Sequence, residues 1–478
     1  LLSDIEFCCV YLLRKRESIK KLIKKVSENA PNGQQKTDGI YINVIIQEGR
    51  WTSRRQFKDR HESYEAYLEP RNDEISLHKA SDLFKHTSTS KHPTKPILVV
   101  GRPGIGKTTL MKKILNEWKQ EKSEFLHGKI VFLIPFRHFG EAETNLRAML
   151  KYAQGMNMTS AAYDYIYEYI CWMPNNVVFI FDGLDELKCD KNLSNQEIVV
   201  NDPGVKANIL VVLKKLVEGK LLPGVTVLIT SRPTAKSIYE HLPIDKEVEV
   251  LGFHKKQIES YVTKFCSNDK DKCTKLWRFI NQSPEYLSLC YIPINSYIIC
   301  LTLKETIETN EEEKVREGSF ESNVPRTITE LYERAVKVLL FKHHTKHKNE
   351  VIPKNFRKEK LPRHVQDNLE DLKRIAKQEL DKDRLVFEIR DNDKYAELSN
   401  CGLISELKDR DSYLYCFLHL TIQEFLAAQY VVDDIENVES FLTEHIDYPK
   451  WHLVIQFVAG LIGYKMRKLE KERNAAER

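Results

Sequence analysis

The sequence has no pair of cysteines with the spacing of a metal-binding or redox motif. Its ten cysteines are spread over 478 residues without a Cys-x-x-Cys, and Cys266 and Cys273 are too far apart for a zinc knuckle. This density is also too low for a disulfide framework. The pattern argues against a zinc site and against a secreted disulfide-rich module. We therefore expect a cytoplasmic protein whose cysteines serve as small apolar side chains.

Long hydrophobic runs are also missing. The longest apolar stretches, such as Leu453–Ile462, are far shorter than the ~20 residues that a membrane-spanning helix needs, and no cleavable signal is visible. We expect no membrane span. Because the chain begins with Leu1 rather than methionine, we expect it to be part of a longer protein.

The sequence has no strong excess of either charge. It contains 74 lysines and arginines against 69 acidic residues, a net charge of +5, with 42% hydrophobic and 30% charged residues. This composition is typical of a soluble globular protein, with about three domains at ~150 residues each. A nucleic-acid-binding protein is an alternative, but the sequence lacks a dense basic recognition helix, so nucleic acid is an unlikely partner.

Short apolar runs alternate with helical patterns between residues 91 and 251. Such runs are typical of strands in a parallel sheet that is covered by helices on both faces. The sequence therefore predicts an α/β domain here, with a helix over Lys107–Lys119. The predicted strands are Ile97–Val100, Lys129–Pro135, Val177–Phe181, Val225–Thr230 and Val248–Leu251.

Other segments give simpler predictions. We expect a helix over Leu1–Val26, a strand over Tyr41–Ile46, and a hairpin whose strands are Leu403–Leu407 and Tyr413–Phe417. Thr306–Ser319 is acidic and has no aromatic residue, so we expect a loop there.

The strongest motif follows the first strand of the α/β region. It matches G-x-x-x-x-G-K-[ST], and it lies between a predicted strand and a predicted helix, as a P-loop must. Glycines let the backbone N–H groups surround phosphate oxygens, and the helix N-terminus adds partial positive charge. We expect Lys107 to bind the β- and γ-phosphates, Thr108 to bind Mg²⁺, and Thr109 to lie near the α-phosphate or cap the helix. The motif consists of Gly101, Arg102, Pro103, Gly104, Ile105, Gly106, Lys107 and Thr108.

A second motif ends the Val177–Phe181 strand in three acidic residues, Asp182, Asp185 and Glu186. A strand ending in a carboxylate brings Asp182 beside the P-loop, where it can hold Mg²⁺, usually through water. Asp185 and Glu186 are candidates to polarise an attacking water, to bind the metal, or to pair with a basic group. Acidic residues after strands also cap helices, which is the structural alternative for Asp185 and Glu186.

A third motif, Ile-Thr-Ser-Arg-Pro, ends the next strand at Arg232. An arginine there can contact the γ-phosphate and respond to its presence, because its guanidinium matches phosphate geometry. Taken alone, a structural ion pair is the default interpretation.

Together these segments resemble the NACHT module of NOD-like receptors, within the STAND class of signalling ATPases. The resemblance extends over roughly residues 95 to 465, and the acidic DGLDE and the downstream HLTIQEF are its most specific parts. Arg137 falls where that family often has an arginine, but its neighbours differ, so it is not included among the site residues. The matching segments are GRPGIGKTTL, VVFIFDGLDEL, ITSRP, EVLGF, LCYIPINSYIICLTL and FLHLTIQEFLAAQY.

The resemblance implies an architecture and two further site residues. Pro293 would lie near the sugar and base of the nucleotide, and His419 would contact the β-phosphate of ADP and hold a closed state. No N-terminal signalling domain and no leucine-rich repeats are recognisable. The implied segments are a helical N-terminal remnant (1–40), a connecting region (41–94), the nucleotide-binding domain (95–251), a helical domain (252–318), a winged-helix domain (319–435) and the start of a second helical domain (436–478).

The function that the resemblance implies is an ATP/ADP switch in an innate-immune-type receptor. ADP would hold the closed state, ATP would favour self-oligomerisation, and hydrolysis would be slow. An upstream ligand and a downstream adaptor are expected but are not identifiable. The alternative is an AAA-type motor or remodeller with fast ATP turnover.

Overall fold

The computed structural model describes most of the chain in two compact units, Leu1–Tyr261 and Val262–Arg478. We describe each unit by itself. In the described part of the chain, no helix is long and apolar enough to cross a membrane. The described residues are 2–28, 41–48, 74–85, 96–139, 143–153, 158–187, 202–266, 269–313, 325, 327–343, 363–382, 384, 386–388, 403–408, 413–417, 420–434, 436 and 438–476.

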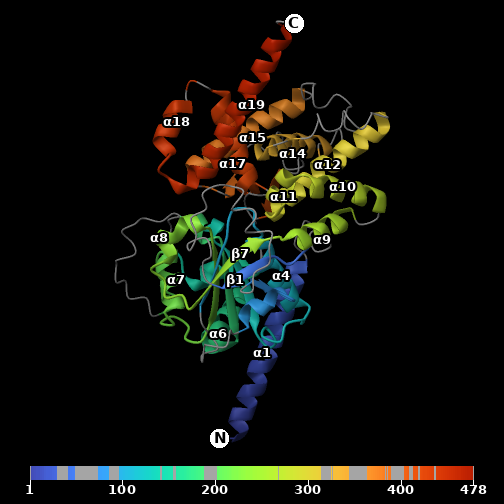
Figure 1. The fold of residues 1–478 in the computed structure, drawn as a ribbon. Coiled ribbons are helices and arrows are strands. Elements are labelled where there is room, and N and C mark those ends of the chain that lie inside the picture. The colour runs from blue at the N-terminus through green and yellow to red at the C-terminus, as the bar shows by residue number, and fades with distance from the viewer. Residues whose placement is uncertain are drawn as a thin grey trace. The chain divides into compact units, whose positions relative to one another are not determined.

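A mixed seven-stranded sheet forms the centre of the first unit, with helices around it (Figure 1). The strand order is β2-β1-β7-β3-β6-β5-β4. β7, β3, β6, β5 and β4 run parallel, whereas β1 pairs antiparallel with both β7 and β2. The strands are β1 (Ile45–Glu48), β2 (Glu74–Ser76), β3 (Ile97–Val100), β4 (Ile130–Pro135), β5 (Val177–Asp182), β6 (Thr226–Ser231) and β7 (Lys246–Gly252).

The central parallel strands β3, β5 and β6 consist mainly of apolar residues on both faces. All residues of β3, β5 and β6 are buried, as continuous apolar runs require in a sheet covered on both sides. This confirms the predicted fold class, an α/β P-loop NTPase domain with a mostly parallel sheet. The helices of this unit are α1 (Leu2–Glu28), α4 (Lys107–Lys119), α5 (Leu146–Leu150), α6 (Ser160–Trp172), α7 (Ile209–Val217) and α8 (Lys236–Tyr239), with short 3₁₀ segments η1 (Ala80–Phe84), η2 (Phe136–His138), η4 (Pro174–Asn176), η5 (Leu184–Glu186) and η7 (Pro233–Ala235).

The segment before the P-loop contributes to this sheet. β1 and β2 form its antiparallel edge, and the Glu117 carboxylate of α4 accepts hydrogen bonds from the Ala80 and Ser81 amides at 2.9 Å each, so it holds η1 against α4. The predicted strand at Tyr41–Ile46 is shifted, because β1 begins only at Ile45.

The second unit is mainly helical and contains a three-stranded antiparallel sheet of order β8-β10-β9. The predicted hairpin is confirmed by the pairing of Leu407 with Leu414. The division between the units falls within α9. The elements are α9 (Lys255–Cys266), α10 (Lys270–Gln282), α11 (Pro284–Cys290), α12 (Pro293–Glu313), α14 (Ile328–His343), α15 (Arg363–Asp381), β8 (Val386–Glu388), β9 (Ile404–Lys408), β10 (Tyr413–Phe417), α17 (Leu420–Asp433), α18 (Val438–His445), η10 (Pro449–Trp451) and α19 (His452–Ala476).

Aromatic side chains hold the helices of this unit together. The Tyr332 ring of α14 lies 5.6 Å from Phe425 of α17 and 5.1 Å from Phe457 of α19, measured between ring centroids. The predicted loop at Thr306–Ser319 is wrong as far as Glu313, because α12 continues through it. Glutamate is a strong helix former, and Leu303 and Ile307 continue the buried side of the helix. Residues 314–319 lie outside the described residues. The division into six segments stays a prediction.

Candidate nucleotide-binding site

The site is built where parallel strands end. β3 lies between β6 and β7 in the sheet, although the chain passes from β3 to β4 at the far edge. Such a switch point opens a crevice at the carboxyl ends of the strands, where ligands of α/β proteins bind. In the register, Val100 pairs with Ser231, and Pro135 pairs with Asp182. The P-loop, the acidic motif and Arg232 therefore meet at one edge.

The P-loop has a backbone that needs its glycines. The amide of Gly101 donates to the Ser231 carbonyl at 3.1 Å, and a Cβ at Gly101 would lie only 2.7 Å from Cγ2 of the buried Ile105. Gly104 and Gly106 have φ values of +73° and +102°, a region that other residues rarely adopt. The glycines thus allow a tight turn of the backbone between β3 and α4, and Gly106 is the N-cap of α4.

The Lys107 ammonium lies against the carbonyl groups of this loop. Its Nζ donates to the oxygens of Gly101 at 2.7 Å and Arg102 at 3.2 Å. Burial lowers the pKa of Lys107 to about 8, and the charges of Asp185 and Asp182 oppose that change while Arg232 adds to it. When the pKa of a lysine is lowered by burial, a negative ligand beside it strongly stabilises its protonated form.

Asp182 is fixed by the neighbouring strand. Its Oδ1 accepts from the Thr230 hydroxyl at 2.6 Å, and the same hydroxyl accepts from the Gly183 amide at 2.8 Å. The Asp182 side chain is buried. Thr230 lies inside the Ile-Thr-Ser-Arg-Pro motif, but the sequence indicated no role for it.

Asp185 forms a two-point contact with Arg232. Its Oδ1 accepts from the Arg232 amide at 2.9 Å, and its Oδ2 lies 2.9 Å from the Arg232 Nε. The two side chains are 9% and 14% exposed, so the pair is only weakly screened by water. This contact joins two of the site residues that the sequence predicts.

Glu186 has a looser partner, Arg137, which is not among the predicted site residues. The Arg137 Nε lies 3.5 Å from Oε2 of Glu186, which is too long and poorly aligned for a hydrogen bond. Burial raises the pKa of Glu186 to about 7, the Arg137 charge opposes this, and Asp185 and Asp182 add to it. Arg137 is the second residue after β4, so its position just beyond a buried strand was a signal that could have identified it.

The remaining predicted residues have different surroundings. Thr108 is partly exposed in the first turn of α4, and Thr109 is exposed, while no side chain caps this helix. Arg102 and Pro103 are partly exposed in the loop. These positions leave the predicted contacts with nucleotide untested.

Pro293 and His419 belong to the second unit. Pro293 is the first residue of α12, a position that suits proline in any helix, because its missing N–H has no partner there. His419 lies outside the described residues. Their predicted contacts with nucleotide stay predictions.

The donor set fits a nucleotide with magnesium. The P-loop amides and Lys107 provide hydrogen-bond donors and charge for phosphates, while Thr108 and Asp182 provide oxygen ligands. Within the described ranges, no cluster of three or more histidine, cysteine or acidic residues could hold a metal by itself.

Comparisons with known proteins point to one family. The family model of the NACHT domain matches residues 95–269. Human NACHT, LRR and PYD domains-containing protein 12 is 24% identical over 436 residues, which cover 82% of this chain and 36% of that protein. Mouse NACHT, LRR and PYD domains-containing protein 3 is 26% identical over 438 residues, which cover 84% and 39%. The chain therefore spans less than two fifths of the length of these relatives.

Proposed function

We propose that the P-loop domain of this chain, which belongs to the NACHT-domain NOD-like receptors, is an ATP/ADP-dependent conformational switch. The family and the P-loop NTPase fold imply nucleotide binding. Our proposal goes further: ADP with Mg²⁺ holds a closed state, ATP favours self-oligomerisation, and slow hydrolysis resets the switch. The observation that carries it is the two-point contact between Asp185 and Arg232 beside the P-loop.

Arg232 is the candidate residue that contacts the γ-phosphate and responds to its presence. Its guanidinium is held by a carboxylate at a site where the P-loop also gathers phosphate-binding groups. A terminal phosphate and the Asp185 carboxylate would compete for the same cation, because both accept hydrogen bonds from guanidinium groups. Only ATP has the γ-phosphate that can compete with Asp185, so the interaction with Arg232 would differ between ATP and ADP.

The acidic residues divide the remaining roles. Asp182 and Thr108 would hold Mg²⁺, which supplies charge neutralisation for the phosphates when bound. Glu186 is the candidate general base, because its pKa of about 7 suits proton transfer near neutral pH. Arg137 positions the Glu186 carboxylate.

The free energy needed for such a switch is larger than the contribution of a single contact with nucleotide. Moving a two-state protein from mostly closed to mostly open takes about 5.5 kcal/mol of differential binding. One charge-assisted hydrogen bond contributes about 1.5–3 kcal/mol. We therefore expect an upstream ligand or partner to supply part of the difference, in a cytoplasmic innate-immune receptor with a downstream adaptor. Pro293 and His419 would complete the closed state around ADP.

The experiment measures ATP and ADP affinity for the wild type and two variants. Arg232→Gln should bind ATP about tenfold more weakly, with ADP affinity nearly unchanged. Asp185→Asn is the matched variant, because it removes the competing charge and should leave ATP affinity unchanged or raised. An equal loss of ATP and ADP affinity in Arg232→Gln would contradict the proposed reading of the γ-phosphate.

A further inference from the structure

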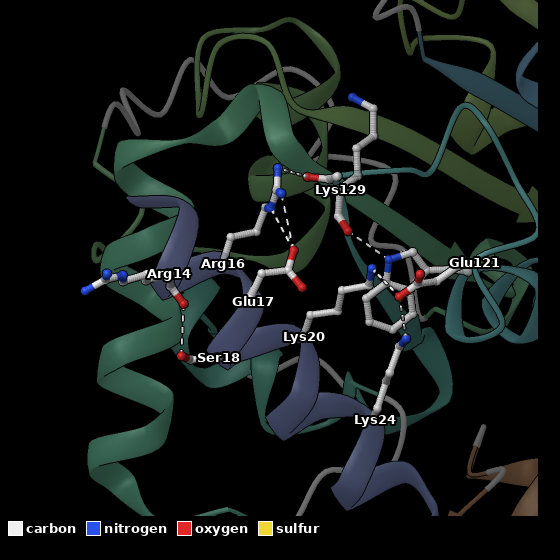
Figure 2. A network of polar contacts seen from close by, with 10 residues as sticks. Arg14, Arg16, Glu17, Ser18, Lys20, Lys24, Glu121 and Lys129 are labelled. Atoms are coloured by element: carbon white, nitrogen blue, oxygen red, sulfur yellow. Dashed lines mark hydrogen bonds and ion pairs between the residues drawn. The ribbon is translucent and has the colours of Figure 1, made fainter. Parts of the chain in front are cut away.

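Helix α1 is part of the nucleotide-binding unit, and it lies against the ends of elements whose other ends form the site. Ile19 and Ile23 of α1 are fully buried. Polar contacts surround this apolar seam, and Figure 2 shows Arg16, Lys20 and Lys24 directed from α1 to neighbouring segments. Buried isoleucines and paired basic side chains together form a docking face.

The first contact is with the C-terminal end of α4. Lys20 and Lys24 donate to the same Oε1 of Glu121, at 2.8 Å and 3.1 Å (Figure 2). These hydrogen bonds, together with the charges of the two lysines, lower the pKa of Glu121 to about 2, so this carboxylate is ionised throughout the physiological range. Glu121 itself has a φ of +56°, which is strained for a residue other than glycine.

The second contact is with the start of β4. A guanidinium N–H of Arg16 donates to the Gly128 carbonyl at 3.3 Å, two residues before β4 begins. The indole N–H of the buried Trp118, in the last turn of α4, donates to the Lys129 carbonyl at 2.8 Å. The end of α4 and the start of β4 are therefore tied to each other and to α1 (Figure 2).

The third contact is with α6, which leads into β5. The Lys15 side chain is 1% exposed, and its Nζ lies 3.1 Å from the Glu168 carboxylate. The same ammonium lies 4.3 Å from the centroid of the Tyr165 ring and 4.8 Å from that of Trp172. A buried ammonium is stable only with such partners in place, so α1 fits this face in one register.

Two of these elements, α4 and β4, have a site residue at or just beyond their far end, and α6 is connected to a site residue through the following strand. α4 begins with Lys107 and Thr108, β4 is followed by Arg137, and the path from α6 leads through β5 to Asp182. α4 has 13 residues and is about 20 Å long, so a rigid helix connects Glu121 to the P-loop. A tilt of α4 at Glu121 would move the phosphate-binding end as well.

We propose that docked α1 is a latch that is coupled to nucleotide: it holds α4, β4 and α6 in the arrangement that retains nucleotide, and its release speeds nucleotide exchange. The coupling rests on the proposed nucleotide binding at the P-loop, whereas the docking rests on α1 alone. Coupling between two sites is reciprocal. Bound nucleotide must therefore stabilise docked α1 by as much as docked α1 stabilises nucleotide binding.

The test uses three forms of the chain besides the wild type. Glu121→Lys reverses the charge under Lys20 and Lys24, and the triple variant with Lys20→Glu and Lys24→Glu restores complementary charges. Glu124→Lys is the control, because it makes the same charge change at an exposed position of the same loop. Hydrogen exchange of the α1 amides reports docking, and the dissociation rate of a fluorescent ADP analogue reports coupling.

We expect faster α1 exchange and about fivefold faster ADP-analogue dissociation in Glu121→Lys, wild-type behaviour in Glu124→Lys, and recovery of both in the triple variant. Faster α1 exchange with unchanged dissociation would overturn the coupling and leave α1 a structural strut. Unchanged α1 exchange in Glu121→Lys would overturn the docking. A wild type that fails to bind the analogue would overturn the proposed function and the coupling together, while the exchange data would still test docking.

Discussion

Charged side chains at the two ends of helix α4 have opposite surroundings: Lys107 is desolvated, whereas Glu121 is exposed and paired with two lysines. At its N-terminus, burial brings the pKa of Lys107 down to about 8, and that of nearby Glu186 up to about 7. Beyond its C-terminus, Lys20 and Lys24 lower the pKa of Glu121 to about 2. Charges that are poorly compensated mark a binding site, whereas charges that are fully paired mark a structural contact. One helix thus joins a site whose charges are poorly compensated to a face whose charges are paired.

The largest expected effect is a loss of nucleotide affinity at the N-terminal end of α4. Lys107→Ala removes the central phosphate-binding charge, so we expect ATP and ADP affinity to fall by about 100-fold or more. Isothermal titration calorimetry measures this loss. Lys112→Ala is the control, since Lys112 is exposed on the same helix, and it should bind normally. Near-wild-type affinity in Lys107→Ala would refute the P-loop assignment.

The next largest expected effect is on ATP hydrolysis, through the candidate general base Glu186. Glu186→Gln should lower single-turnover ATP hydrolysis by about 100-fold while ATP affinity stays within a few-fold of the wild type. Since only the ionised carboxylate accepts a proton, wild-type hydrolysis should rise with pH through about 7 and then level off. Arg137→Gln should shift that profile to higher pH, because the arginine lowers the pKa of Glu186. A profile that Arg137→Gln leaves unchanged would count against the positioning role of Arg137.

The pH dependence of binding sharpens the comparison further. The protonated lysine is the form that attracts phosphate, and Lys107 without ligand loses its proton near pH 8. ADP affinity should therefore fall as pH rises above about 8, approaching a tenfold loss per pH unit. Lys107→Arg should show a flat profile, since arginine keeps its proton. A flat wild-type profile between about pH 7.5 and 9.5 would contradict the lowered pKa.

The smallest expected effect is at the α1 end. The pKa of Glu121 is depressed in the folded chain from an ordinary value of 4.5 to about 2. Its contribution to stability is therefore fully present above about pH 4.5 and is lost as the pH falls toward 2. Resistance of α1 to proteolysis should stay constant from neutral pH down to about 5 and decline below that. In Glu121→Gln this acid-dependent decline should be smaller, and an equal decline would show that other groups control α1.

The sequence predicted the local parts of the site. A P-loop, a strand ending in Asp182, and a strand ending before Arg232 are recognisable because each motif lies within a few residues and follows an apolar run. Thr230 was missed, and Arg137 was left out because its neighbours differ from the family pattern. The roles of both residues depend on which strands are neighbours. The pairing of Pro135 with Asp182 brings Arg137 to the acidic motif, and no local pattern encodes that register.

The surroundings of two recognised segments depend on long-range pairing in the same way. The strand pattern at Tyr41–Ile46 was recognised, but its place at the edge of the sheet follows from pairing with β7. The helical pattern of α1 was also recognised, yet its docking depends on Glu121 and Glu168, which are about 100 and 150 residues away in sequence. The acidic end of α12 was mistaken for a loop, because charge density was weighed above the helix propensity of glutamate.

The central claim, that this domain is a nucleotide switch, is tested most directly by the nucleotide that the chain retains. The chain would be purified without added nucleotide and denatured, and the released nucleotide would be identified and quantified by chromatography. The switch predicts near-stoichiometric ADP that exchanges slowly with the solution. An empty chain that turns over added ATP rapidly would contradict the switch and favour an AAA-type motor or remodeller.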